Sequence, residues 1–165
     1  MSNFEAPLLN ASVIATFRTA GILYVSTTAA TSRRYQVYEV EFGQTGSLAS
    51  TDIQATWDLS RAGATNALVG SSVTPNALDP GDAAPIVGLY FNNITTEPTY
   101  TTAGNGLSLK QWAINQRGSY RWRALDDGDN LIIPATLQHG IGVRMLIPAG
   151  VAAMSAFGNI SFVER

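Results

Sequence analysis

The sequence predicts an all-β protein, an antiparallel β-sandwich or jelly roll, and three observations support this class. Apolar and polar residues alternate with a period of two in most segments, and the helical period of 3.6 is nearly absent. Short segments rich in Gly, Pro, Asn and Asp separate these runs. The chain has 165 residues, which suits one domain with its own hydrophobic core.

The clearest predicted strand covers residues 52–59, DIQATWDL. Apolar side chains occupy one face: Ile53, Ala55, Trp57 and Leu59. Polar side chains occupy the other: Asp52, Gln54, Thr56 and Asp58. Because successive side chains of a strand point to opposite sides, this segment should have one buried and one solvated face.

The same alternation predicts further strands over residues 12–18, 35–42, 119–125 and 140–148, and a last one within 150–164. Each is expected to turn one apolar row toward the core. The expected rows are Val13, Ala15 and Phe17; Tyr38, Val40 and Phe42; Tyr120, Trp122 and Ala124; and Ile141, Val143, Met145 and Ile147. Glu39 and Glu41, and likewise Arg121 and Arg123, fall on the opposite faces.

Turn residues predict how these strands are joined. The Arg117-Gly118 step predicts a hairpin between the segments around Trp112 and Tyr120. The run Asp126–Asn130 predicts a second hairpin, since Asp-Gly between two strands is a strong hairpin signal. Pro134 and Pro148 should close strands, because proline cannot donate to a ladder.

Two segments depart from the alternation. Residues Ser60–Pro85 are rich in Gly, Ala, Ser, Asn and Pro and predict a long loop around residues 60–85. At most one short helix is expected there, with Asp79 as its N-cap and Pro80 at its first position. Residues 1–9 are expected to form an N-terminal arm, and residues 10–165 a single β-sandwich domain.

Composition narrows the classes of function. The chain has no cysteine, which excludes disulfides and thiolate chemistry. Its formal net charge of −2, with 13 % charged residues, is unlike the basic footprint of a nucleic-acid binder. With 45 % hydrophobic residues and few charges, two interpretations are open: a surface partly covered by neighbours, or an ordinary β domain with Thr, Ser and Asn on its outer faces. Residues 1–10 do not read as a signal peptide, and no run approaches the roughly 20 apolar residues of a membrane helix. We therefore expect synthesis in the cytoplasm and no membrane partner.

The residues that could carry chemistry are few, and we expect no catalytic residue, cofactor or metal site. His139 is the single histidine, and histidine metal sites usually need a second such ligand or a thiolate. The aspartates 126, 127 and 129 resemble a calcium loop, but Leu137 stands where an EF-hand needs glutamate. A turn histidine and a turn of aspartates are the preferred interpretations.

Three other patterns suggest chemistry, and each also has an ordinary structural interpretation. Glu39 and Glu41 share a strand face and could flank a sugar as a catalytic pair, although a solvated or arginine-matched face is more common. The run Arg117–Arg123 mixes arginines with aromatics, as single-strand binders do, but places them on opposite faces. The Gly104–Gly106 segment lacks the rest of a phosphate-loop pattern.

Three stretches together resemble the jelly-roll capsid decoration or cement proteins of tailed bacteriophages. They are EPTYTTAGNG at 97–106, INQRGSYRWRAL at 114–125 and LIIPATLQHGIGVRM at 131–145. The resemblance implies a homotrimer on the outside of a virion that bridges major capsid proteins. It also implies that residues 1–9 and 60–85 make the capsid contact, and it assigns no individual site residue.

Two other functions remain open at this point. A carbohydrate- or receptor-binding module of a phage tail or fibre would use exposed aromatic platforms, for which Tyr90, Tyr100 and Trp112 are candidates. A hydrolase would use Glu39 and Glu41. The structural virion protein, made in the host cytoplasm and located on the capsid surface, is the leading hypothesis.

Overall fold

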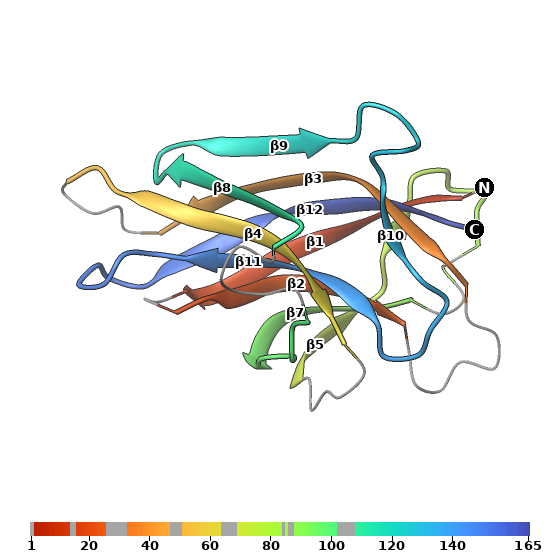
Figure 1. The fold of residues 1–165 in the computed structure, drawn as a ribbon, viewed down its shortest axis with the longest axis horizontal. Coiled ribbons are helices and arrows are strands. Elements are labelled where there is room, and N and C mark those ends of the chain that lie inside the picture. The colour runs from red at the N-terminus through yellow and green to blue at the C-terminus, as the bar shows by residue number, and fades with distance from the viewer. Residues whose placement is uncertain are drawn as a thin grey trace.

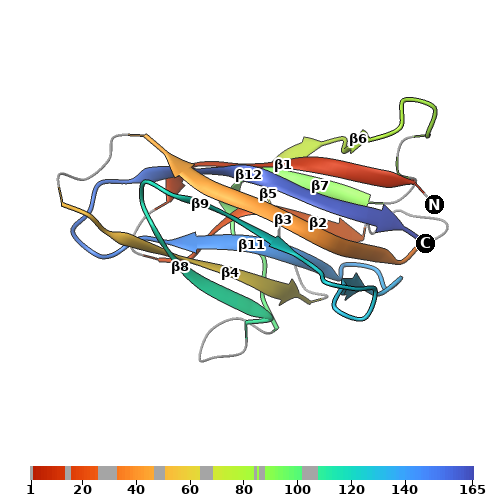
Figure 2. The same ribbon diagram turned by 90° about the horizontal axis from the view of Figure 1, so that it is seen from above.

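The computed structural model describes residues 2–13, 16–25, 33–46, 51–63, 69–83, 85, 88–101 and 108–165, with backbone alone for 11–13 and 88–91. These residues form twelve strands and no helix, which confirms the predicted all-β class. No helix able to cross a membrane occurs among them. The strands run along the long axis of the molecule, and both termini lie at the same end (Figures 1 and 2).

The strands form two antiparallel sheets. The first has the order β10-β3-β12-β1-β6, and β9 also pairs with β3. Its strands are β1 (Asn3–Val13), β3 (Tyr35–Thr45), β6 (Asn76–Ala77), β9 (Ser119–Arg123), β10 (Leu131–Ile133) and β12 (Met154–Glu164). The second has the order β5-β7-β2-β11-β4-β8. Its strands are β2 (Arg18–Val25), β4 (Gln54–Ala62), β5 (Val69–Val73), β7 (Gly88–Thr96), β8 (Lys110–Asn115) and β11 (Gly140–Leu146).

The pairing order is that of a jelly roll. Strands β1, β2, β3 and β4 pair, in this order, with β12, β11, β9 and β8. A chain folded back as one long hairpin and then rolled into two layers has this pattern, with eight strands shared between two sheets. Strands β5, β6 and β7 follow β4 at the bend of that hairpin and widen both sheets.

The core lies between the two sheets and is built from the alternating rows. Trp57 and Leu59 of β4 and Ile141, Val143 and Met145 of β11 are buried, as their alternation predicts. Phe42 of β3 packs on Trp57 with ring centroids 4.7 Å apart. Aromatic pairs at this spacing contribute beyond the area that they bury.

The N-terminal arm predicted for residues 1–9 is wrong for the residues that the structure describes. Residues Asn3–Leu9 belong to β1, between β12 and β6, and pair with Phe157–Val163 of β12. Phe4, Ala6 and Leu8 alternate inward and are buried. The proline at position 7 obscured this pattern.

The long loop predicted for residues 60–85 is also corrected. The segment begins inside β4 and contains β5 and β6, and residues 64–68, 84, 86 and 87 lie outside the described part. The sequence allowed at most one short helix, starting at Asp79, and the structure has a turn there, in which the Asp79 carboxylate accepts a hydrogen bond from the Gly81 amide at 2.8 Å. Asparagine and aspartate make such turns with their own backbone as readily as they cap helices.

Both predicted hairpins are wrong, although both turns exist. The Arg117-Gly118 turn carries the chain from β8 in the second sheet to β9 in the first, so it joins two layers. Strands β9 and β10 both pair antiparallel with β3, along the edge that β12 leaves free. The loop Ala124–Asn130 therefore rises from one edge of β3 and returns to it, and β9 runs beside β3 in both views (Figures 1 and 2).

A β-bulge alters the expected facing of β3. Glu39 pairs with Ser161 and Val37 with Phe162, so Tyr38 is an extra residue without its own partner on β12. Val40 and Phe42 face the core as predicted, but the inward row continues with Val37 and Tyr35. Tyr38 is half-buried. A bulge adds one residue and re-aims the neighbouring side chains, which a strict period of two does not anticipate.

Candidate functional site

The single histidine lies in the turn before β11. The His139 carbonyl accepts a hydrogen bond from the Val25 amide at 2.9 Å, and its own amide donates to the Thr136 carbonyl at 3.2 Å. This position agrees with a turn histidine. Within the described ranges, no group of three or more His, Asp or Glu side chains is placed to hold a metal ion.

The paired glutamates of β3 lie on the outer face of the first sheet. Glu39 forms ion pairs with Arg121 at 2.7 Å and with Arg123 at 3.7 Å, both from the neighbouring strand β9. The face is thus matched by arginines, as one of the two interpretations expected. On the other side of β9, Tyr120 packs on Phe42 with a centroid distance of 5.8 Å. The aromatic rings and the arginines of β9 therefore lie on opposite faces of the strand.

The aromatic platforms considered from sequence are only partly described. Trp112 closes the edge of the core, with its ring 5.2 Å from that of Phe42. The side chain of Tyr90 and the whole of residues 104–106 lie outside the described part. Tyr100 does not offer a free platform, because its ring and hydroxyl belong to a network of polar contacts.

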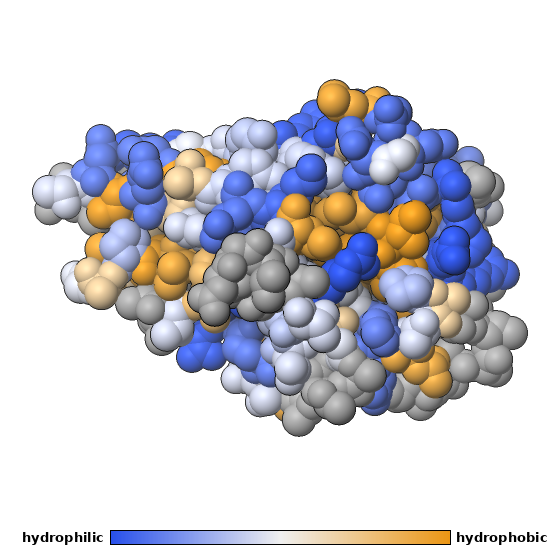
Figure 3. Space-filling model, in the orientation of Figure 1, coloured by the Kyte–Doolittle hydropathy of each residue, from blue (hydrophilic) through white to orange (hydrophobic). Residues whose placement is uncertain are grey.

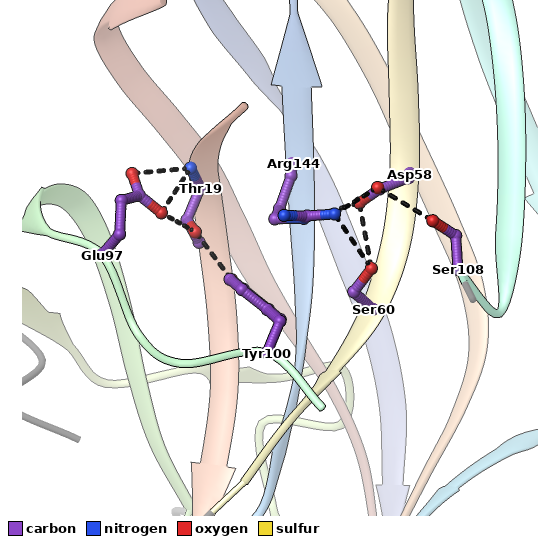
Figure 4. A network of polar contacts seen from close by, with 7 residues as sticks. All are labelled: Thr19, Asp58, Ser60, Glu97, Tyr100, Ser108 and Arg144. Atoms are coloured by element: carbon purple, nitrogen blue, oxygen red, sulfur yellow. Dashed lines mark hydrogen bonds and ion pairs between the residues drawn. The ribbon is translucent and has the colours of Figure 1, made fainter. Parts of the chain in front are cut away.

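This network, here the Arg144 network, lies on the outer face of the second sheet (Figure 4). Its members are Thr19, Asp58, Ser60, Glu97, Tyr100, Ser108 and Arg144. Arg144 of β11 stands opposite Asp58 of β4 and donates to both carboxylate oxygens, at 2.8 and 2.5 Å. The two side chains are 9 % and 1 % exposed. Such a fork-to-fork pair combines charge with fixed geometry.

The acceptor capacity of Asp58 is fully used. Ser60 and Ser108 donate to its two oxygens at 3.2 and 3.0 Å, in addition to the two bonds from Arg144. An ionised carboxylate accepts about four hydrogen bonds. The centre of the network is therefore closed, and its chemistry is that of a structural ion pair.

The Arg144 network also contacts and stabilises the segment that follows β7. The Arg144 guanidinium lies 4.6 Å from the Tyr100 ring centroid, an attractive cation–π geometry. Thr19 gives its one hydroxyl proton to Glu97 at 2.5 Å, so Tyr100 is the donor in its 2.6 Å bond to Thr19. Burial of the hydroxyl raises the pKa of Tyr100. A Cβ at Gly142 would collide with that hydroxyl, so the glycine makes room for the tyrosine.

The outer face of the first sheet carries an open groove at the bulge, here the bulge groove. Its volume is about 530 Å³, and the loop Ala124–Asn130 forms one wall. The groove is lined by strands β1, β3 and β12, by the end of β9, by this loop and by the residue after β12. The lining residues are Asn3, Gln36, Tyr38, Arg123, Ala124, Asp126, Asp127, Asn130, Val163 and Arg165.

The polar groups of the bulge groove are mixed and only loosely paired. Two guanidinium and two carboxylate side chains line it, which balances their formal charge. Arg165 and Asn130 approach Asp127 at 3.7 and 3.3 Å, both longer than the bonds around Asp58. Asp126 accepts from the Gly128 amide at 2.7 Å, which shapes the loop as a turn.

Two further features distinguish this groove. Gln36 is 6 % exposed, and its buried Oε1 accepts no hydrogen bond from the described residues. A buried unsatisfied polar atom costs about 1–3 kcal/mol, so it calls for an explanation. Burial raises the pKa of the Tyr38 phenol, and the neighbouring charge of Glu39 raises it further. The phenol therefore stays protonated and can donate at neutral pH.

Comparisons with known proteins do not supply a function, because the chain matches no protein-family profile, no curated protein and no solved structure. The sequence predicts neither the Arg144 network nor the bulge groove. Asp58 was assigned to a solvated face because alternation cannot show what covers a sheet from outside. One signal was present in the sequence: Gly140, Gly142 and Arg144 alternate with the apolar row of β11, and two glycines on the same face as a lone arginine suit a covered face.

Proposed function

We propose that the chain is a non-enzymatic structural protein of a virion, which decorates or cements a phage capsid as a homotrimer that bridges major capsid proteins. Its place would be the capsid surface, after synthesis in the host cytoplasm. The jelly-roll strand order supports the proposal at the level of fold, and the exposed apolar side chains support it at the level of surface.

Parts of two of the three stretches that carry the resemblance lie along one edge of β3. Residues 114–125 include the end of β8, the interlayer turn and β9, whereas residues 131–145 include β10 and most of β11. Strands β9 and β10 follow one another along the same edge of β3. The third stretch is described up to Thr101 and is part of the segment that the Arg144 network holds.

The observation that carries the proposal is the exposure of large apolar side chains along this edge. Leu125 is 92 % exposed, and it is accompanied by Tyr120, Ile132 and Leu137. Apolar patches reach the surface near the loop after β9 and over β10 (Figure 3). Edge strands with exposed apolar groups invite association with another chain, and natural proteins usually protect them unless a partner covers them.

A second exposed set lies in the segment expected to contact the capsid. Val69 and Leu78, at the start of β5 and just after β6, are each 52 % exposed. Many symmetric copies would make modest contacts at both places collectively strong, because later contacts form at high effective concentration. We assign self-association to the β9–β10 edge and capsid contact to the Val69–Leu78 region.

Light scattering and co-sedimentation test this proposal. The chain of 17.5 kDa should elute as a trimer and should sediment saturably with shells of the phage that encodes it. Leu125→Asp should weaken the trimer, and Leu78→Asp should weaken shell binding while leaving the trimer intact. A monomer that never sediments with shells would overturn the proposal.

One observation favours a second function, the carbohydrate- or receptor-binding module. The bulge groove is concave, and its lining includes one buried polar atom, the Gln36 Oε1, that has no hydrogen bond within the described part of the chain. The chain could carry this activity together with a structural role, so the two are tested separately.

A further inference from the structure

We infer that the bulge groove is a carbohydrate-binding site for one or two neutral sugar units. This inference does not rest on the proposed capsid role, which depends on other surfaces. It rests on three independent features of the groove: its balanced charge, the bulge at Tyr38 and the unsatisfied amide of Gln36.

The charge of the groove selects a neutral ligand. Arg123 and Arg165 offset Asp126 and Asp127, so the lining favours neither an anion nor a cation. The same side chains are planar forks that can match two adjacent hydroxyls, as donors or as acceptors. Sugar hydroxyls are both donors and acceptors, and neighbouring pairs suit such forks.

The bulge supplies an aromatic surface where regular alternation would not. As the extra residue of β3, without a partner on β12, Tyr38 lines the groove instead of following the regular rows of its strand. A tyrosine ring has an apolar body and a polar tip, which suits the C–H face and hydroxyl edge of a sugar ring. Bulges are over-represented next to functional sites because they re-aim a side chain in this way.

Gln36 supplies the specific reason to expect a ligand. Its Oε1 is buried without a hydrogen bond, beside the groove that the residue lines. We therefore assign Gln36 as a positioning and specificity residue for the sugar.

The experiment is a glycan-array screen of the full chain, followed by titration of the sugars that bind. Asn130→Ala and Arg165→Ala should each weaken binding about tenfold, the scale of one lost charge-assisted hydrogen bond. Arg117→Ala is the matched control: it removes an exposed arginine, paired with Asp52, in the turn between β8 and β9, at the other end of β9 from Arg123. It should leave the affinity unchanged.

A second variant separates a ligand role from a folding role. Gln36→Met should abolish or weaken sugar binding and raise the melting temperature, since it removes an unsatisfied buried group. A lower melting temperature would mean that Gln36 is structural. The inference is overturned if no neutral sugar binds, if the groove variants bind as well as the wild type, or if free amino acids bind in place of sugars. None of these results alters the expected trimer or shell binding.

Discussion

The outer faces of the two sheets use polar residues in opposite ways. On the second sheet, Asp58 and Arg144 are almost fully buried, and the carboxylate is saturated with hydrogen bonds. On the first sheet, the bulge groove leaves its guanidiniums exposed and Gln36 unsatisfied. The closed network therefore holds the second sheet in one arrangement, whereas the incompletely satisfied groove is where we infer that a ligand binds.

The largest effect should come from opening the closed network. Asp58→Ala leaves the buried Arg144 guanidinium without its partner, which should lower the free energy of unfolding by about 3–5 kcal/mol. The control on the other sheet is Glu39→Ala, whose arginine partners are exposed and whose loss should cost about 1 kcal/mol or less. Urea denaturation measures both, and equal losses would contradict the contrast between the two faces.

Removing both charges should be milder than removing one. The Asp58→Leu/Arg144→Met double variant replaces the ion pair with apolar side chains of similar size, a change that is often neutral or stabilising. We expect it to recover at least 2 kcal/mol, roughly half of the loss in Asp58→Ala. If the double variant is as unstable as the single one, the network stabilises through more than its ion pair.

The hydroxyl of Tyr100 should have a smaller effect, with a pH signature. Tyr100→Phe removes the bond to Thr19 and should cost about 1 kcal/mol near neutral pH. Because folding raises the pKa of Tyr100 above its ordinary value of 10.0, the unfolded chain releases this proton first. The contribution of the protonated Tyr100 to the free energy of unfolding is therefore fully present below pH 10 and is lost as the pH rises above it.

The same alkaline loss should be weaker in Tyr100→Phe, measured by urea denaturation between pH 9 and 11, a window set by the ordinary phenol pKa of about 10. Tyr24 and Tyr38 also have raised pKa values and contribute equally to both proteins. An identical pH dependence in the two proteins would show that Tyr100 does not titrate differently on folding.

The smallest effect should have the opposite sign. Gln36→Met replaces an unsatisfied buried amide with an apolar side chain of similar length and should stabilise the fold by about 1 kcal/mol. Gln116→Met is the control, because its amide donates to the Thr51 carbonyl at 3.0 Å and its loss should destabilise. If both variants destabilise, the groove does not differ from an ordinary buried polar site.

Much of the fold could be predicted from the sequence. The buried rows of β4 and β11, which include Trp57 and Met145, could be predicted because successive side chains of a strand point to opposite faces. The bulge at Tyr38 could not be predicted, since it depends on the register with β12. The two turns were found but misread, because a local Asp-Gly or Arg-Gly signal does not say whether the next strand stays in the same layer.

The candidate site was harder to predict for the same reason. The bulge groove joins Asn3, Tyr38, Asp127 and Arg165, residues from across the whole chain, and no local spacing links them. The Asp126–Asn130 run was recognised as a turn, but its role as a groove wall depends on where β9 and β10 leave and rejoin β3. The residues that cover the outer face of the second sheet near Asp58 likewise come from a distant part of the chain, the segment after β7 that contains Tyr100, about 40 residues away.

The most direct test of the contrast between the two faces is amide chemical-shift mapping of the labelled full chain. The titrants are hexoses, N-acetylhexosamines and their disaccharides. We predict saturable shifts at Gln36, Tyr38, Arg123 and Asn130, and none at Ser60, Ser108 or Arg144. Shifts confined to the Arg144 network, or no shifts with any sugar, would contradict the account.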